Sequence, residues 1–374
     1  MRVLLTGGGT GGHIYPALAV ARRLKEMDEE VTILYVGTER GLESRIVPKE
    51  GITFRAIEIE GFKRSMNFDG IKYNVRSVSL FLKSIREAKN IIKKFKPDVV
   101  LGTGGYVSAP IGYAAAKAGV PTVVHEQNGF LGLTNKFLIR YIDRLAISFD
   151  DILSQVDGYD EKVVFTGNPR AQEVAKSEMP MVDRVYGLDV TKPIMLIFGG
   201  SRGSARINQA VVDAYEELVT RAYQVIFVTG EMYYETILAQ LDAIAPLKNN
   251  PHFVVKPYIH NMIEVLRHTS IIISRSGATT IAEITVLGIP SILIPSPNVT
   301  EDHQTKNAMS LVNNQAAILL KEDELSGTSL LAQMDYLMQN LSIRQSMGER
   351  ALELGEPYAT DQLIQVMLDD IKNK

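Results

Sequence analysis

The sequence predicts an α/β protein of two successive doubly wound units, each with a mainly parallel sheet. Short apolar runs alternate with helix-like patterns along the whole chain, which is typical of βαβ units. These runs lack the apolar–polar alternation of half-exposed strands, as expected when both faces of a sheet are covered. The chain has 374 residues, and the series restarts near its middle, so two domains are expected.

The expected strands fall into two series. In the first half they span 2–6, 31–36, 98–101, 122–125 and 144–147, with helices at 17–25 and 76–95. In the second half they span 191–200, 223–229, 253–255, 270–274 and 291–295.

The two series meet at a segment of helix breakers, Thr166–Arg170, which contains Gly167 and Pro169. We therefore expect domains at 1–166 and 167–357. The tail from 358 to 374 has apolar residues at helical spacing and is expected to form a helix that packs on one of the domains.

Composition narrows the class of protein. Hydrophobic residues make up 45% and charged residues 22%, which excludes a disordered or collagenous chain. The absence of cysteine excludes disulfides, thiolate metal sites and cysteine nucleophiles. The chain shows no secretory signal, and its longest uncharged stretch, 99–116, contains glycines and a proline, so it is a poor membrane span. A cytoplasmic protein, soluble or peripheral to a membrane, is expected.

The first glycine-rich loop, Gly7–Gly12, directly follows the first expected strand and precedes a helix. Backbone N–H groups at a helix N-terminus attract anions, and glycine lets a ligand approach closely. The loop satisfies the G-x-G-x-x-G pattern of dinucleotide sites, but the acidic residue expected about 20 positions on is not clearly present, since Glu39 comes late.

Three more loops of this kind follow expected strands, at 102–106, 199–204 and 274–280. Each alone is compatible with a simple strand-to-helix turn. Because the carboxyl ends of parallel strands meet at one edge, four such loops favour a ligand site at the carboxyl edge of both sheets. Glu283, in the helix after the last loop, suits ribose hydroxyls; the alternative is a surface-exposed helical glutamate.

Seven motifs in order resemble the MurG family, the UDP-N-acetylglucosamine transferases of peptidoglycan synthesis. They read GGGTGGHIYPALAVA, GTGGYVSAP, HEQNGFLGLTNKFL, GNPR, GGSRGSARIN, SRSGATTIAE and EDHQTKNA. The resemblance implies a GT-B fold, with two Rossmann-like domains facing across a cleft and the C-terminal helix returning to the first. It implies an inverting transfer of GlcNAc from UDP-GlcNAc to the 4-hydroxyl of the muramoyl sugar of undecaprenyl-pyrophosphoryl-MurNAc-pentapeptide, at the cytoplasmic face of the membrane.

The resemblance also implies roles for individual residues. In the second domain, Ile259 would face uracil, Arg170 would reach the uracil edge, Ser201 would meet phosphate and Gln304 would bond the sugar hydroxyls. The expected UDP-GlcNAc ligands are Thr10, Gly11, Gly12, Asn128, Arg170, Ser201, Ile259, Ser276, Gly277, Ala278, Thr279, Glu283 and Gln304, and the expected acceptor residues are Gly104, Gly105 and Tyr106. The family often has two glutamines where this chain has His303 and Gln304, so the contact of His303 is open.

The expected chemistry needs a base for the acceptor hydroxyl and stabilisation of the leaving diphosphate. His13 is the first candidate base, because histidine titrates near neutrality; the alternative is that it only shapes the loop. Glu126 is the second, with a structural carboxylate as the alternative, and His125 is interpreted as structural. Helix N-terminal amides can stabilise the diphosphate, and the chain has no Asp-x-Asp motif, so no protein-bound metal and no cofactor are expected.

The segment 63–96 carries ten Lys and Arg residues and two acidic residues. Cations of this kind contribute about 1 kcal/mol each at an anionic surface, so the segment is expected to bind the membrane, although its apolar stripe also fits core packing. Nucleic acid is not expected as a partner, because the overall charge is −3 and no nucleic-acid motif is present.

Four other functions are alternatives to the peptidoglycan transferase. They are another lipid glycosyltransferase of the same fold, a UDP-GlcNAc 2-epimerase, an NAD-dependent oxidoreductase and a pure binding protein. The acceptor-half motifs favour the peptidoglycan enzyme, and the basic segment would have no purpose in an epimerase.

Overall fold

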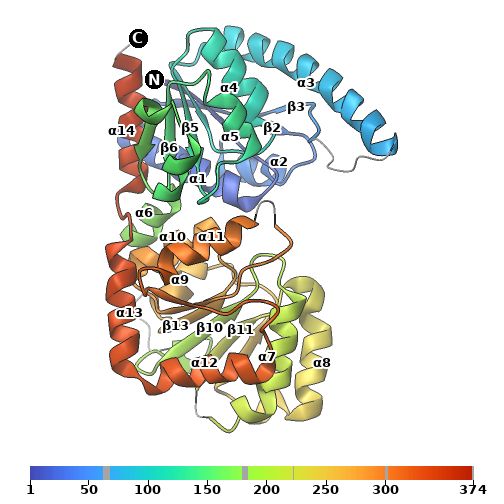
Figure 1. Cartoon of the computed structure of the whole chain (residues 1–374), viewed down its shortest axis with the longest axis vertical. Helices are drawn as coiled ribbons and strands as arrows, with labels where there is room; N and C mark the ends of the chain where they lie inside the picture. The colour runs from blue at the N-terminus through green and yellow to red at the C-terminus, as the bar shows by residue number, and fades with distance from the viewer. Residues whose placement is uncertain (62–67, 179–183, 222, 300–301, 373–374) are drawn as a thin grey trace. The chain divides into compact units, whose positions relative to one another are not determined.

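The chain folds into two compact units, of which the first contains Met1–Gln172 and Tyr358–Lys374 and the second Glu173–Pro357. The computed structural model in Figure 1 describes all residues except 62–67, 179–183, 222, 300–301 and 373–374, and it also leaves out the side chains of 68–76 and 78. Each unit is built around a parallel sheet of its own.

In the described part of the first unit, seven strands form a parallel sheet in the order β3-β2-β1-β4-β5-β6-β7. The central strand β1 lies between β2 and β4, with Leu4 opposite Leu34 and Val100. The strands are β1 (Arg2–Thr6), β2 (Thr32–Thr38), β3 (Thr53–Ile57), β4 (Val99–Gly102), β5 (Thr122–Glu126), β6 (Arg144–Ile147) and β7 (Val163–Phe165).

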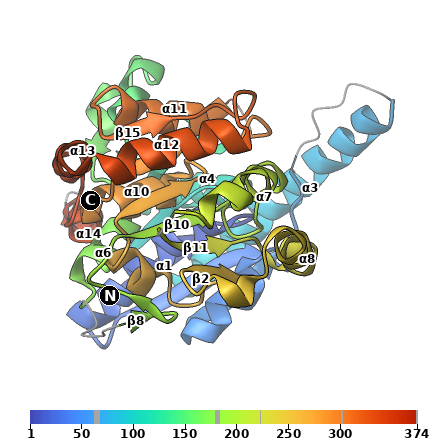
Figure 2. The same cartoon turned by 90° about the horizontal axis from the view of Figure 1, so that it is seen from below.

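Helices cover both faces of this sheet, because successive residues of the central strands are apolar and point to opposite faces. Val3 and Leu5 pack with α1 and α14 on one face, whereas Leu4 packs with α3 and α4 on the other. In both views α3 extends beyond the edge of the sheet (Figures 1 and 2). The helices are α1 (Gly11–Met27), α2 (Glu43–Ile46), α3 (Phe68–Phe95), α4 (Ser108–Lys117), α5 (Leu133–Leu138), α6 (Pro169–Lys176) and α14 (Ala359–Lys372), with 3₁₀ turns at Val47–Glu50, Asp150–Gln155 and Asp160–Lys162.

In the described part of the second unit, six strands form a parallel sheet in the order β12-β11-β10-β13-β14-β15. They are β10 (Ile194–Phe198), β11 (Gln224–Val228), β12 (Phe253–Lys256), β13 (Ile271–Ser274), β14 (Ser291–Leu293) and β15 (Ala317–Leu319), and a separate antiparallel pair is formed by β8 (Arg184–Val185) and β9 (Leu188–Asp189). Met195 and Ile197 pack with α7, α8 and α12 on one face. Leu196, which points the other way, is equally buried, so this sheet too is covered on both faces.

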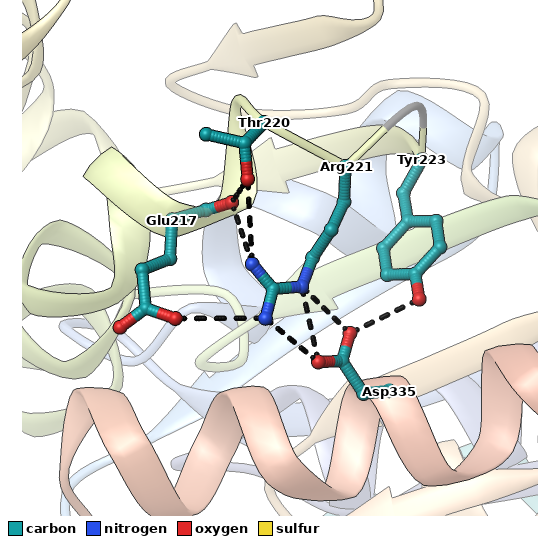
Figure 3. Close-up of polar contacts among 5 residues, drawn as sticks. All are labelled: Glu217, Thr220, Arg221, Tyr223 and Asp335. Carbon is teal, nitrogen blue, oxygen red and sulfur yellow. Dashed lines mark hydrogen bonds and ion pairs between the residues drawn. The ribbon is translucent and has the colours of Figure 1, made fainter.

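An ion pair joins two helices that cover this sheet. The helices of the unit are α7 (Ala205–Leu218), α8 (Tyr234–Ile244), α9 (Met262–Arg267), α10 (Ala278–Leu287), α11 (His303–Val312), α12 (Gly327–Gln339) and α13 (Leu341–Glu353), with 3₁₀ turns at Glu231–Tyr233 and Leu247–Asn249. Arg221, just after α7, donates from Nε to both carboxylate oxygens of Asp335 on α12 at 3.0 Å and from a terminal nitrogen to the Glu217 carbonyl (Figure 3). Tyr223 adds a hydroxyl donor to the same carboxylate, which holds α12 in place.

The C-terminal helix α14 packs on the first unit. Leu363, Ile364 and Met367 are buried in the same cluster as Leu5, and the Nε atom of Arg23 on α1 donates to Asp361 at 2.6 Å. The apolar pattern of this helix left open which domain it would join, whereas the family resemblance implied the first domain, where the helix lies.

The boundary between the units differs from the expected one. The sequence placed it after Thr166, whereas Gly167–Gln172 belong to the first unit. The physical reason is their bonding to α14: the hydroxyl of Thr360 donates to the carbonyl of Pro169, and the N–H of Asp361 donates to the side-chain oxygen of Gln172. Arg170, which we expected in the second domain, is therefore part of the first unit.

Within the described residues, no helix is both long enough and apolar enough to cross a bilayer.

Candidate active site

Two glycine loops meet at the carboxyl edge of the first sheet. The loop after β1 runs from Gly7 to Thr10 and leads into α1, and the loop after β4 contains Gly104 and Gly105. The N–H of Gly8 donates to the carbonyl of Gly104 at 3.3 Å. Gly105 has a φ of +79°, and a Cβ atom there would lie 2.4 Å from the Gly8 carbonyl oxygen. Only glycine allows this approach, so the two loops form one rigid edge.

His13 lies between these loops in a defined orientation. Its Nδ1 is 2.8 Å from the carbonyl oxygen of Gly8, which can only accept a hydrogen bond. Nδ1 must therefore carry the proton, and Nε2 keeps its lone pair in the neutral ring. The ring sits over Gly104, since a Cβ atom on that glycine would be 3.0 Å from Nε2. The structure thus combines both interpretations of His13, a residue that fixes the loop and a candidate base.

A buried carboxylate that the sequence analysis missed holds the first glycine loop from beneath. Glu43, at the start of α2, is fully buried. One of its oxygens accepts from the N–H and the hydroxyl of Thr38 at 2.9 and 2.7 Å, and the other accepts from the N–H of Gly9 at 3.1 Å. This N–H is thereby directed into the protein, which differs from a glycine loop whose amides all face a dinucleotide. The sequence gives only a weak indication of this role, because a single glutamate in a polar segment is common.

Tyr35 supports the same loop from β2. Its hydroxyl donates to the carbonyl of Gly7 at 2.9 Å, and the side chain is fully buried. Burial, with a smaller contribution from the charge of Glu43, raises the pKa of Tyr35 above its ordinary value, so the hydroxyl remains a donor. A tyrosine in an apolar strand gives no sign of this role in the sequence.

The contacts of Glu126 are those of a structural carboxylate, which was the alternative to its role as the second candidate base. Its side chain is 4% exposed, and both oxygens are already occupied by donors. One accepts from the N–H and side-chain amide of Asn128 at 3.2 and 3.3 Å, and the other from the N–H of Gly132 and the amide of Asn135 at 2.9 and 2.8 Å. The carboxylate thus orients Asn128 and the loop after β5.

His125 is structural in the same sense. It is fully buried, its Nε2 bonds the carbonyl of Gly167 at 2.9 Å, and its Nδ1 lies 2.9 Å from the side-chain amide of Gln127. Burial lowers the pKa of His125 to about 4, so the ring is neutral near pH 7.

The remaining expected residues of the first unit lie along the same edge. Thr10 is exposed as the residue before α1, Gly11 and Gly12 form the first turn of that helix, and Tyr106 is 40% exposed beside Gly61. Together with His13 and Asn128 they come from the loops after β1, β4 and β5, three adjacent strands.

In the second unit, the loop after β10 leads to the N-terminus of α7. Ser204 caps the helix by accepting from the N–H of Ile207, and it also receives a 2.7 Å bond from Arg275. Ser201 is exposed in this loop, as expected for a phosphate contact. Arg206, near the start of α7, donates to the carbonyl oxygens of Glu322 and Leu325, so its guanidinium stabilises the protein.

The loop after β13 leads to the N-terminus of α10. Gly277 precedes the helix, and space beside it is open, since a Cβ atom there would meet nothing within 4 Å. Ala278 and Thr279 form the first turn. The hydroxyl of Ser276 is buried and donates to the carbonyl of Gln304 at 2.7 Å, so that side chain braces α11.

Two polar side chains of this unit are oriented by their surroundings. Glu283 is 6% exposed, so the alternative of a surface glutamate is wrong. The side-chain oxygen of Gln304 accepts from the N–H of Ser296 at 2.8 Å, which leaves its NH₂ group as the donor. Ile259 is buried just beyond the carboxyl end of β12. The residues of this unit that are expected to bind UDP-GlcNAc therefore gather at the carboxyl edge of its sheet.

No cluster of His, Asp and Glu suited to a metal ion occurs among the side chains that the structure describes.

Comparison with known proteins assigns the chain to a family. Residues 3–147 match the glycosyltransferase family 28 N-terminal domain, and residues 194–363 match the C-terminal domain of that family. The chain is 54% identical over 372 residues to the UDP-N-acetylglucosamine–N-acetylmuramyl-(pentapeptide) pyrophosphoryl-undecaprenol N-acetylglucosamine transferase of Lactiplantibacillus plantarum, with all of both chains covered. The protein of this name from Bacillus subtilis is 50% identical, again over both full lengths. The chain belongs to this transferase family.

Solved structures agree with the assignment. The crystal structure of Acinetobacter baumannii MurG is 26% identical, with a TM-score of 0.75, 98% of this chain and 99% of that chain covered. The expected GT-B class, with its two Rossmann-like units, is confirmed, and the chain is a glycosyltransferase. A putative UDP-N-acetylglucosamine 2-epimerase from Listeria monocytogenes, 12% identical with a TM-score of 0.69 over 100% of this chain and 97% of that chain, shares the fold alone.

Substitution of Glu43 tests its role beneath the glycine loop. Glu43→Gln keeps the volume but replaces one acceptor oxygen by an NH₂ group, so the part-buried N–H of Gly9 or the buried N–H of Thr38 loses its partner. We expect the free energy of unfolding of the first unit to fall by about 1–3 kcal/mol, measured by urea denaturation followed by circular dichroism. The exposed Glu29→Gln is the matched control, and equal stability of the two variants would contradict the role.

Proposed function

We propose that this protein transfers GlcNAc from UDP-GlcNAc to the 4-hydroxyl of MurNAc in undecaprenyl-pyrophosphoryl-MurNAc-pentapeptide, with inversion to a β-1,4 link. The observation that carries the proposal is the 54% identity, over the full length, to a transferase named for these substrates. Such a reaction is a step in building peptidoglycan.

In the proposed reaction, His13 is the base. The acceptor hydroxyl gives its proton to Nε2 of His13, its oxygen bonds to C1 of GlcNAc, and the bond from C1 to the diphosphate breaks, releasing UDP. The carbonyl of Gly8 supports this step because it accepts from Nδ1–H and stabilises the imidazolium that forms. Gly104, Gly105 and Tyr106 bind the acceptor beside this ring.

In the proposed reaction Glu126 has a structural role and holds the loop after β5. Four donors already bind its carboxylate, so we assign it the orientation of Asn128 toward the sugar rather than proton transfer. Thr10, Gly11 and Gly12 contact the donor sugar from the first loop.

The second unit binds most of the donor. In this unit the backbone of Ile259 contacts uracil, the buried Glu283 accepts from the ribose hydroxyls, and the NH₂ group of Gln304 donates to a GlcNAc hydroxyl. Arg170, which belongs to the first unit, keeps its proposed role at the uracil edge.

The leaving diphosphate is stabilised by backbone N–H groups at the N-termini of α7 and α10, where Ser201 and residues 276–279 lie. We propose that these groups suffice and that the protein needs neither a bound metal nor a cofactor.

The first unit is proposed to bind the cytoplasmic face of the membrane through the basic segment 63–96. Lys72 and Arg76 fall where side chains are not described, but Leu82 on α3 is 62% exposed, and Lys89, Lys93 and Lys94 are exposed nearby. An exposed apolar side chain among cations suits an anionic lipid surface.

Charge reversal tests this membrane contact. Replacing Lys72, Arg76 and Lys83 by Glu should abolish most sedimentation with anionic vesicles, because roughly 1 kcal/mol per cation is lost. Reversal of Arg184, Lys192 and Lys248 in the second unit should leave binding intact. Equal binding by both triple variants would place the membrane contact elsewhere.

The transfer itself is tested with radiolabelled UDP-GlcNAc and a short-chain analogue of the lipid-linked muramoyl-pentapeptide, in EDTA. We expect product from the wild type. His13→Ala should lower kcat by about 10²–10⁴-fold, because the base is removed, with an unchanged dissociation constant for UDP-GlcNAc. His252→Ala, which changes an exposed histidine of the second unit, is the control.

Each outcome of this assay is decisive. Absence of product with tight UDP-GlcNAc binding would contradict the proposed acceptor and favour the epimerase or another acceptor. Product that forms only after magnesium is added would contradict the proposal that no metal is needed. Near-wild-type turnover of His13→Ala would contradict the assignment of His13 as the base.

A further inference from the structure

A large pocket adjoins the glycine loops of the first unit, and of its lining residues only Tyr106 and Lys83 have a named role in the proposed function above. It has a volume of about 1090 Å³, and its lining comes from the segments after β2 and β3, from α3, and from Gly9 and Tyr106. This volume is at the upper end of what small-molecule sites enclose. Gly9 lies in the loop that leads into α1, the helix of His13, and Tyr106 lies in the expected acceptor loop. The pocket therefore begins where the proposed function places the acceptor sugar.

Three arginines of this pocket stand out. Arg40, Arg45 and Arg86 are exposed and line the pocket, and within the described chain none of their guanidinium groups has an ion-pair or hydrogen-bond partner. By contrast, Lys83, which lines the same pocket, is paired with Glu58 at 2.6 Å. A guanidinium group binds a carboxylate through two parallel hydrogen bonds, so these arginines are suited to an anionic ligand group.

The rest of the lining decides which kind of anion fits. Four carboxylates, Glu39, Glu58, Glu60 and Glu87, line the pocket along with the four cations. A diphosphate, which carries only negative charge, would be repelled by them. A peptide has backbone N–H donors for carboxylates and a C-terminal carboxylate for an arginine.

Apolar contacts are available as well. Leu42 is 50% exposed and Tyr106 40% exposed at the pocket, and a peptide bearing small apolar side chains would cover them.

We propose that this pocket binds the peptide arm of the acceptor, with its C-terminal carboxylate held by Arg40, Arg45 and Arg86. The inference rests on the proposed function. In muramic acid the peptide-bearing lactyl group is on C3, the ring carbon next to the C4 hydroxyl. An acceptor whose 4-hydroxyl lies at His13 must therefore place its peptide close to the loop of Gly9, where this pocket opens.

The test compares two acceptors with the same short lipid chain, one bearing the pentapeptide and one whose lactyl group is capped as a simple amide. For the wild type we expect a KM at least roughly tenfold lower with the peptide, since one charge-assisted bond contributes that much. In the combined variant Arg40→Gln, Arg45→Gln, Arg86→Gln, the KM of the peptide acceptor should rise to that of the capped acceptor. The KM of the capped acceptor and of UDP-GlcNAc should stay within about twofold.

Arg55→Gln is the matched control, because Arg55 is an exposed arginine on β3 that does not line the pocket. A triple variant that raises the KM of both acceptors equally would assign the arginines to the diphosphate and overturn the proposal. Unchanged kinetics with both acceptors would remove the pocket from acceptor binding. If the wild type transfers GlcNAc to neither acceptor, the proposed function itself fails, so the two failures are distinguishable.

Discussion

The buried carboxylate of Glu43 is the constraint on which the glycine-loop edge of the first unit depends. A run of glycines has no side chains to fix its own conformation, so the surrounding protein must hold it. Glu43 accepts from the N–H of Gly9, and Tyr35 donates to the carbonyl of Gly7. Between these two anchors the carbonyl of Gly8 is presented to His13, and this contact selects the tautomer whose Nε2 can accept a proton. A carboxylate outside the expected substrate contacts thus helps to set the tautomer of the proposed base.

The second unit achieves the same kind of preorganisation with different groups. Here the helix N-termini of α7 and α10 supply fixed N–H donors, and side chains are oriented by the backbone. Ser276 donates to the carbonyl of Gln304, and the N–H of Ser296 fixes the oxygen of that glutamine. Binding groups held in this way need little ordering when a ligand arrives, which favours affinity and selectivity.

The sequence predicted the central strands well because they are buried and continuously apolar. β1 and β6 have the expected bounds, and the other predicted strands differ by a few residues at their ends. Besides the short antiparallel pair β8 and β9, three strands of the two parallel sheets were missed, namely β3, β7 and β15. All three are edge strands that are partly exposed, so they lack an apolar run to reveal them.

The sequence predicted those parts of the candidate site that lie within a recognisable motif. The glycine loops and His13 were found because glycine and histidine have distinctive chemistry. Glu43 was missed because its role exists only once α2 packs beneath a loop 34 residues earlier in the chain. The burial of Glu283, the four donors on Glu126 and the place of Arg170 in the first unit likewise depend on tertiary contacts that no local pattern encodes.

The most direct test of this account is the tautomer of His13. Nitrogen NMR of the enzyme labelled at its histidine rings, with His13→Asn used to assign the signal, distinguishes the protonated from the unprotonated ring nitrogen. The account predicts that the neutral form of the ring carries its proton on Nδ1 and leaves Nε2 bare. A neutral His13 protonated on Nε2 would contradict it, because the nitrogen assigned to the acceptor hydroxyl in the proposed reaction would then be unable to take the proton.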